Sequence, residues 1–169
     1  MRIAEDGLIF GDYNADDCFH IEKTDVYVRL SAKGVKSVEF ILHQPDDRKL
    51  LFVEGKSTLP AKGNADAFNE EVTVISQKFM DSLQLACGIW FGEHNQEVEM
   101  PKNAENFFKF GEQIVFVLVI KNRKGNLIYI ADKIKQLLSR EHRLWRFEVL
   151  VLNENDAQRK KLVIQEDAS

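Results

Sequence analysis

The segments that decide the fold are Ser37–His43, with the sequence SVEFILH, and Lys49–Lys56, with the sequence KLLFVEGK. Both are rich in β-branched, aromatic and aliphatic residues, and the polar turn QPDDR at residues 44–48 separates them, so they predict a β-hairpin. One carboxylate interrupts each apolar segment, Glu39 in the first and Glu54 in the second. A hairpin in the middle of a sheet buries both of its faces, and a buried charge needs a partner. The hairpin is therefore the first candidate for a functional site.

The alternation of side chains along each strand says which residues can share a site with the two acids. Glu39 shares a face with His43, and Glu54 shares a face with Phe52 and Lys56. Two neighbouring carboxylates repel each other unless a cation lies between them. Mg²⁺ is the natural cation for an all-oxygen site. Lys56 would then be placed to orient a water molecule or to stabilise charge that develops on a phosphate.

The remaining residues predict helices and strands around this hairpin. The clearest pattern is Ala65–Trp90, where apolar residues recur in steps of three and four and predict a long amphipathic helix. The other expected elements are a small strand at Leu8–Phe10, a helix over Ile21–Lys33 that also alternates like a strand at 25–30, a lid or partly structured loop over Gly92–Gly111, a buried strand at Gln113–Lys121, a helix over Ala131–Arg143 and a strand at Phe147–Leu152. This order predicts an α/β or α+β fold with helices packed on a mixed sheet.

Composition predicts a single cytoplasmic domain. The 169 residues suit one domain, with a core at about 20–152 and a charged tail at 153–169. The longest apolar run, Ile114–Ile120, is too short to span a bilayer, and the first residues lack the apolar segment of a signal peptide. The net charge of −4 disfavours general DNA binding by counterion release, but it is compatible with an enzyme that contacts a few phosphates.

The hairpin and the helix after it resemble the core of the PD-(D/E)xK, or restriction-endonuclease-like, nuclease superfamily, and in particular an uncharacterised single-domain bacterial branch of it. The residues that carry the resemblance are VEFIL at 38–42, KLLFVEGKS at 49–57, SQKF at 76–79, DSL at 81–83 and VLVLNE at 149–154. The resemblance covers most of residues 20–152. It implies an αβββαβ core, a central mixed sheet flanked by helices, and metal-dependent hydrolysis of DNA or RNA.

The resemblance also implies roles for single residues. Glu39 would be the first metal-binding acid, Glu54 the second and Lys56 the catalytic lysine, with Mg²⁺ or Mn²⁺ as the cofactor. The Gly55 carbonyl would complete the metal shell, and Gln77 stands where some branches place a catalytic glutamine. The acid that the first helix sometimes contributes would be Glu22. In this superfamily the first acid is usually Asp, whereas this chain has Glu39.

A second function stays open beside the nuclease. A catalytically inactive member of the same fold would serve as a protein-interaction or nucleic-acid-binding module, as a possible homodimer; the acidic net charge and the Glu39 departure favour it. Nucleotide binding is poorly supported, because Leu50 stands where a phosphate-binding loop ending at Ser57 would need its first glycine. No nucleophile elbow for serine or cysteine hydrolysis is present either.

Other residues have two interpretations each. Phe107, Phe108 and Phe110 are either a stacking platform for bases or, as we expect, core residues. A basic set on and after the second helix is expected to be solvated and would otherwise contact phosphates: Lys133, Lys135, Arg140, Arg143 and Arg146. The histidines His20, His43, His94 and His142 have no ligand-like partners in the sequence, and we expect no role for them.

Overall fold

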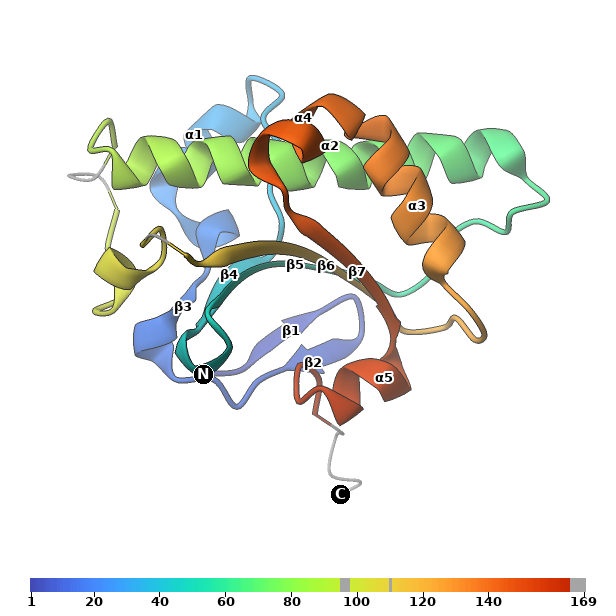
Figure 1. Cartoon of the computed structure of the whole chain (residues 1–169), viewed down its shortest axis with the longest axis horizontal. Coiled ribbons are helices and arrows are strands. Elements are labelled where there is room, and N and C mark those ends of the chain that lie inside the picture. Colours follow the sequence, from blue (N-terminus) through green and yellow to red (C-terminus); the bar gives the residue numbers. More distant parts are fainter. Residues whose placement is uncertain (95–97, 110, 165–169) are drawn as a thin grey trace.

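The computed structural model describes residues 1–94, 98–109 and 111–164. At its centre is a five-stranded mixed sheet with the strand order β3-β4-β5-β6-β7 (Figure 1). Neighbours among β3, β4 and β5 are antiparallel, whereas β5, β6 and β7 run parallel. The strands are β3 (Cys18–Phe19), β4 (Phe40–Gln44), β5 (Lys49–Lys56), β6 (Gln113–Ile120) and β7 (Glu148–Asn153).

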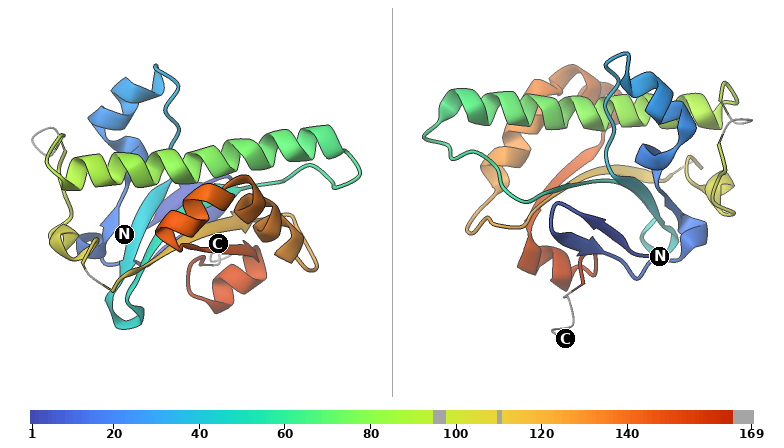
Figure 2. Two further views of the ribbon diagram at one scale, coloured as in Figure 1. Left: turned by 45° about the horizontal axis from the view of Figure 1, so that its top comes forward. Right: turned by 180° about the vertical axis from the view of Figure 1, so that it is seen from behind.

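The sheet lies between two layers, which the two further views in Figure 2 also show. Four helices cover one face; a two-stranded hairpin and a short helix cover the other. The first layer comprises α1 (Asp25–Ser31), α2 (Ala65–Trp90), α3 (Ile128–Leu137) and α4 (Ser139–Trp145), and the second β1 (Ile3–Glu5), β2 (Leu8–Phe10) and α5 (Glu154–Arg159). This confirms the predicted mixed sheet flanked by helices.

Strands β5 and β6 are inner strands of the sheet, and both of their faces are covered. Every residue from Leu50 to Gly55 is buried, as is every residue from Val115 to Ile120. The parallel register places Phe52 opposite Phe116. Strands buried on both faces are continuous apolar runs, which explains why the expected Gln113–Lys121 strand is found with almost the same bounds.

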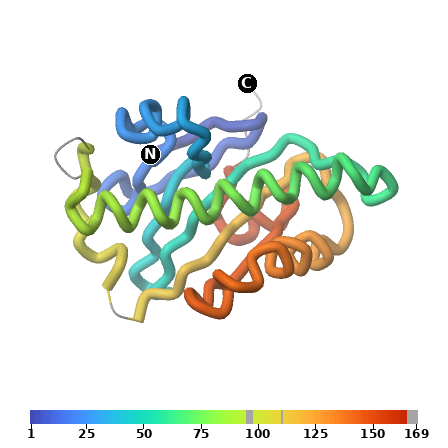
Figure 3. Tube along the Cα trace, turned by 90° about the horizontal axis from the view of Figure 1, so that it is seen from above, coloured from blue at the N-terminus to red at the C-terminus, as the bar shows by residue number. Residues whose placement is uncertain are grey.

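Helix α2 lies across the helical face of the sheet, as the view from above shows (Figure 3). Its bounds are those predicted from the spacing of its apolar residues. The predicted inner residues Phe68, Val72, Ile75, Phe79, Leu83 and Ala86 are all buried, and Trp90 is half-buried. Phe79 packs α2 against the sheet by stacking on Phe116 of β6, with ring centroids 4.7 Å apart.

The helix predicted over Ile21–Lys33 begins later than expected. Residues Ile21–Lys23 form a 3₁₀-helix, η2, and α1 follows after Thr24. The Thr24 hydroxyl accepts a hydrogen bond from the Tyr27 amide at 3.2 Å and so caps the new helix. The strand-like alternation at 25–30 does not form a strand.

The order of elements also differs from the αβββαβ core that the resemblance implies. Between α1 and α2 the structure has only the β4–β5 hairpin, which is joined by the 3₁₀-turn η3 (Pro45–Asp47). The strand that completes this side of the sheet is β3, and it precedes α1 in the chain. The mixed sheet flanked by helices is therefore confirmed, whereas the order of elements along the chain is not the expected αβββαβ.

The second expected helix, Ala131–Arg143, is two helices. The backbone bends at Leu138, which is buried in the core, and α4 continues in a new direction (Figure 1).

The expected charged tail from Asn153 instead forms α5, because Asn153 caps this helix by accepting a hydrogen bond from the Asp156 amide at 2.9 Å. Beyond α5, Leu162 and Val163 are buried beneath the sheet, and Val163 pairs with Phe10.

The expected loop at Gly92–Gly111 contains the 3₁₀-turn η5 (Ala104–Asn106) and contributes to the core. Phe107 is fully buried and stacks on Trp90, and Phe108 packs partly buried beside them. This favours the core interpretation for these two residues, while Phe110 lies outside the described residues.

Among the helices described, none combines the length and the apolar character needed to cross a membrane.

We predict that Phe116→Ala lowers the free energy of unfolding by about 3–5 kcal/mol, because it leaves a cavity in the core between the sheet and the helices. The Phe116 ring touches three others, Phe52, Phe79 and Phe147, at centroid distances of 5.7, 4.7 and 4.4 Å. Urea denaturation measures the change. Phe91→Ala is the matched control, since Phe91 is 84% exposed, and a similar loss in both variants would contradict this account of the core.

Candidate metal centre

The two predicted acids lie side by side at one end of the β4–β5 hairpin. Glu39 comes immediately before β4, and its amide donates a hydrogen bond to the Val53 carbonyl at 3.1 Å. Glu54 is the next residue along β5, on the face that α2 covers. The antiparallel register, with Phe40 opposite Val53, therefore brings together two carboxylates that lie 15 positions apart in the sequence.

Both carboxylates are removed from solvent. Glu54 is fully buried and Glu39 is only 5% exposed. Within the described residues, the Oε2 atom of Glu54 has no hydrogen-bond partner. A buried carboxylate oxygen without a partner carries a large desolvation cost, so this atom marks a place where a ligand would be stabilising.

Lys78 on α2 supplies the nearest positive charge. Its Nζ atom lies 2.7 Å from Oε1 of Glu54 and 3.9 Å from Oε1 of Glu39. Lys56 lies on the same side, with its Nζ atom 3.6 Å from Oε1 of Glu54 and 3.2 Å from Oε1 of Glu71. Two lysines thus surround the Glu54 carboxylate, and Lys78 already holds the position of a cation between the two acids.

Burial alters the acidity of both carboxyl groups. It raises the pKa of Glu54 from 4.5 to about 7, although the charges of Lys78 and Lys56 act in the opposite direction. The pKa of Glu39 is also raised well above its ordinary value, first by burial, then by the neighbouring charge of Glu54 and by a hydrogen bond with Glu22. Burial alone would lower the pKa of Lys78, but the carboxylates around it raise it overall, so Lys78 stays charged.

The structure does not bring Gln77 into this group. Gln77 lies on the exposed side of α2, and the neighbouring Lys78 is the residue that contacts the acids. The sequence does contain a signal for Lys78. Glu71 and Lys78 are seven positions apart and share one face of the helix, beside the apolar stripe that packs on the sheet.

Gly55 has a packing role that the resemblance does not include. Its absent side chain would point to the face opposite Glu54. A Cβ atom there would lie 3.1 Å from a ring atom of Phe10. The glycine therefore lets the β2 strand approach β5 closely, whether or not its carbonyl binds a metal.

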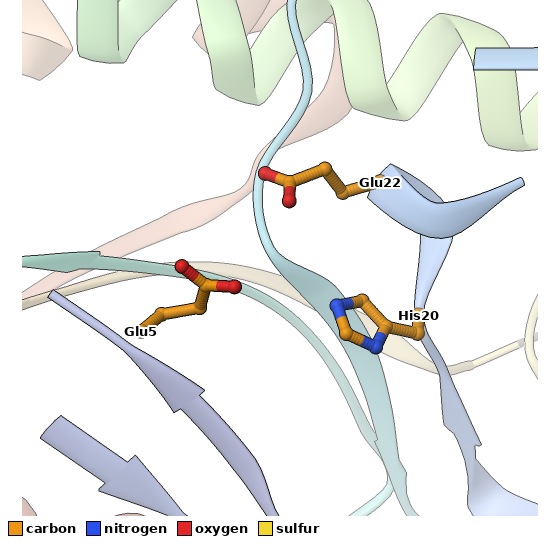
Figure 4. A group of neighbouring side chains, drawn as sticks. All are labelled: Glu5, His20 and Glu22. Atoms are coloured by element: carbon orange, nitrogen blue, oxygen red, sulfur yellow. The ribbon is translucent and has the colours of Figure 1, made fainter. Parts of the chain in front are cut away.

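Glu22 lies beside Glu39, and it belongs to a second cluster as well. It lies in η2, where its carboxyl group shares the hydrogen bond with Glu39. On its other side are Glu5, from the end of β1, and His20, and one ligand atom from each of these three residues lies within 4.8 Å of the others (Figure 4). The sequence carries no signal for Glu5 or His20, because no local pattern shows that the β1–β2 hairpin folds back beneath this segment.

Comparison with known proteins adds no assignment, since no protein-family model, curated protein or solved structure matches this chain.

We predict that Glu39→Gln stabilises the metal-free protein at pH 8 but changes it little at pH 5. The folded protein holds a proton on Glu39 more tightly than the unfolded chain does, so stability falls as the pH rises above about 4.5. Removing this group should add on the order of 1–3 kcal/mol at pH 8. Urea denaturation at both pH values measures it. An equal loss of stability at both values would instead show an ionised Glu39 held by Lys78.

Proposed function

We propose that this protein is a metal-dependent nuclease of the PD-(D/E)xK type, which hydrolyses phosphodiester bonds in DNA or RNA. The observation that carries the proposal is the buried pair of Glu39 and Glu54, flanked by Lys56 and Lys78, with one oxygen of Glu54 lacking a hydrogen-bond partner among the described residues. A purely structural ion pair is a weak explanation, because a buried pair seldom stabilises a fold more than apolar residues of the same volume.

The residues present fit a hard divalent cation. Glu39 and Glu54 would hold Mg²⁺ or Mn²⁺ through carboxylate oxygens, with waters and a substrate phosphate completing the shell. When bound, the ion would polarise the phosphate and supply an activated water. Binding requires both carboxylates to be ionised, and their raised pKa values make the affinity increase with pH.

Lys56 and Lys78 would have different roles in the reaction. Lys56 lies at the end of β5 beside Glu54 and Glu71, where its ammonium group would orient a water molecule. Lys78 must leave its position between the acids when a metal enters. Its side chain, anchored on α2, would then contact the phosphate and stabilise its developing negative charge.

A second candidate function rests on the surface of α3 and α4. Exposed apolar residues around the junction of these helices are Leu137 at 40%, Leu144 at 71% and Trp145 at 42%. Arg140 and Arg143 lie on α4 with the last two of them. Together with the Lys78–Glu54 ion pair, which neutralises a carboxylate without any metal, this surface favours an inactive interaction module or a homodimer. That function predicts no effect of Mg²⁺ or Mn²⁺ on stability and an oligomer that Trp145→Ala disrupts.

We predict that the wild-type protein cleaves DNA or RNA only with Mg²⁺ or Mn²⁺, and that Glu54→Gln reduces the rate by at least about 10²-fold. Gel assays on single- and double-stranded DNA and on RNA measure the rate. Gln77→Ala is the matched control, because this side chain is exposed on the same helix as Lys78, and we expect an unchanged rate. Metal binding without cleavage of any substrate would contradict the nuclease function and favour the interaction module.

We also predict that Lys78→Gln tightens binding of Mn²⁺ several-fold, because the ion no longer competes with an ammonium group for Glu54. Calorimetric titration at pH 8 measures the affinity. The same variant should lose cleavage activity if Lys78 contacts the phosphate. Weaker Mn²⁺ binding by Lys78→Gln would show that the lysine positions the acids rather than substituting for the metal.

A further inference from the structure

We propose that Glu5, His20 and Glu22 form a separate site for a transition-metal dication, with Zn²⁺ the best-fitting ion. The three side chains come from different segments, namely the end of β1, the residue after β3 and the 3₁₀-helix η2. They point toward one another into a common space (Figure 4). Their ligand atoms all lie within 4.8 Å of one another, so small side-chain movements would close them around one ion.

His20 provides an observation independent of the acids. Its Nε2 atom is buried, and it has no hydrogen-bond partner among the described residues. Figure 4 shows the outer edge of the imidazole turned toward both carboxylates. Buried imidazole nitrogens are normally hydrogen-bonded to protein or water, or bound to a metal. The two carboxylates do not accept a hydrogen bond from this nitrogen, but they lie near enough for one ion to join all three groups.

The charges around the cluster also indicate a cation. The Nζ atom of Lys23 lies 3.3 Å from Oε1 of Glu22 and 3.9 Å from Oε1 of Glu5. This lysine bridges the two acids from outside, with its side chain 61% exposed. An exposed, flexible side chain is easily displaced, so Lys23 would give way to an ion that also binds the imidazole.

The ligand set distinguishes this site from the one at Glu39 and Glu54. One imidazole nitrogen and two carboxylate oxygens suit Zn²⁺, whereas Mg²⁺ prefers oxygen ligands alone. Three protein ligands leave one position for water. The side chains of Glu5 and Glu22 are 30% and 23% exposed, so an ion can reach these two carboxylates from solvent.

The site would attach the β1–β2 hairpin to the rest of the fold. Glu5 is the last residue of β1, whereas Glu22 and His20 flank the region between β3 and α1. An ion held by all three joins these two parts of the chain, and binding to the folded state raises stability by mass action. The inference does not rest on the nuclease proposal, because Glu5 and His20 belong to this cluster alone; Glu22 is the residue that the two clusters share.

The test is a titration of the full chain with Zn²⁺ by calorimetry and with Co²⁺ by visible absorption. We expect one site per chain with d–d bands of imidazole-ligated Co²⁺ and a rise in melting temperature with Zn²⁺. His20→Gln and Glu5→Gln should each weaken binding at least about tenfold, with circular dichroism confirming that they fold. His142→Gln is the matched control and should bind as the wild type does.

The outcomes separate this site from the proposed nuclease centre. Glu54→Gln should keep the Zn²⁺ site while losing any Mg²⁺-dependent cleavage, and His20→Gln should do the reverse if the two sites act separately. Wild-type affinity in both His20→Gln and Glu5→Gln, or no Zn²⁺ binding by the wild type, would overturn the proposal. If one of these two variants fails to fold, the other variant decides the result.

Discussion

The complete burial of one carboxylate, that of Glu54, is the constraint on which the rest of the site depends. Strand β5 is covered on both faces, so Glu54 has no route to water, and its charge must be balanced inside the protein. Lys78 reaches down from α2, Lys56 follows two residues later, and the pKa of Glu54 rises to about 7. An interior that balances a charge in this way can also exchange a proton, an ammonium group or a metal ion at that point.

Both layers of the fold contribute to the polar region. The helical layer supplies Lys78 and Glu71 from α2, and the opposite layer supplies Glu5 from the β1–β2 hairpin. Phe10 on that hairpin packs against Gly55, directly behind Glu54. The position of the acidic residues is therefore set by packing on both faces of the sheet.

Much of the fold could be predicted from the sequence, because the signals that defined it are local. The step of three and four residues in α2 and the continuous apolar runs of β5 and β6 describe elements that pack by their own periodicity. Two of the boundaries that differ from the prediction depend on single capping residues. Thr24 delays the start of α1, and Asn153 begins a helix where charge suggested a tail.

The site could be predicted only where its residues belong to one supersecondary unit. Glu39 and Glu54 are neighbours because a hairpin of fixed register joins them. Lys78 shares a helix face with Glu71, but its placement beside the acids depends on how α2 is rotated against the sheet. The family resemblance pointed to the adjacent Gln77 instead. Glu5 and His20 could not be predicted as neighbours, because their proximity depends on the long-range placement of β1, which no periodic pattern in the sequence indicates.

Glu22 lies in both clusters, and this has a thermodynamic consequence. The same carboxyl group is hydrogen-bonded to Glu39 and faces Glu5 and His20. A Glu22 carboxylate bound to Zn²⁺ could no longer share a proton with Glu39, so filling one cluster would change the free energy of filling the other. Linkage makes that effect reciprocal: whatever factor one ion imposes on the affinity of the second, the second imposes on the first. Through a single side chain, the N-terminal hairpin would then influence metal binding at the end of β5.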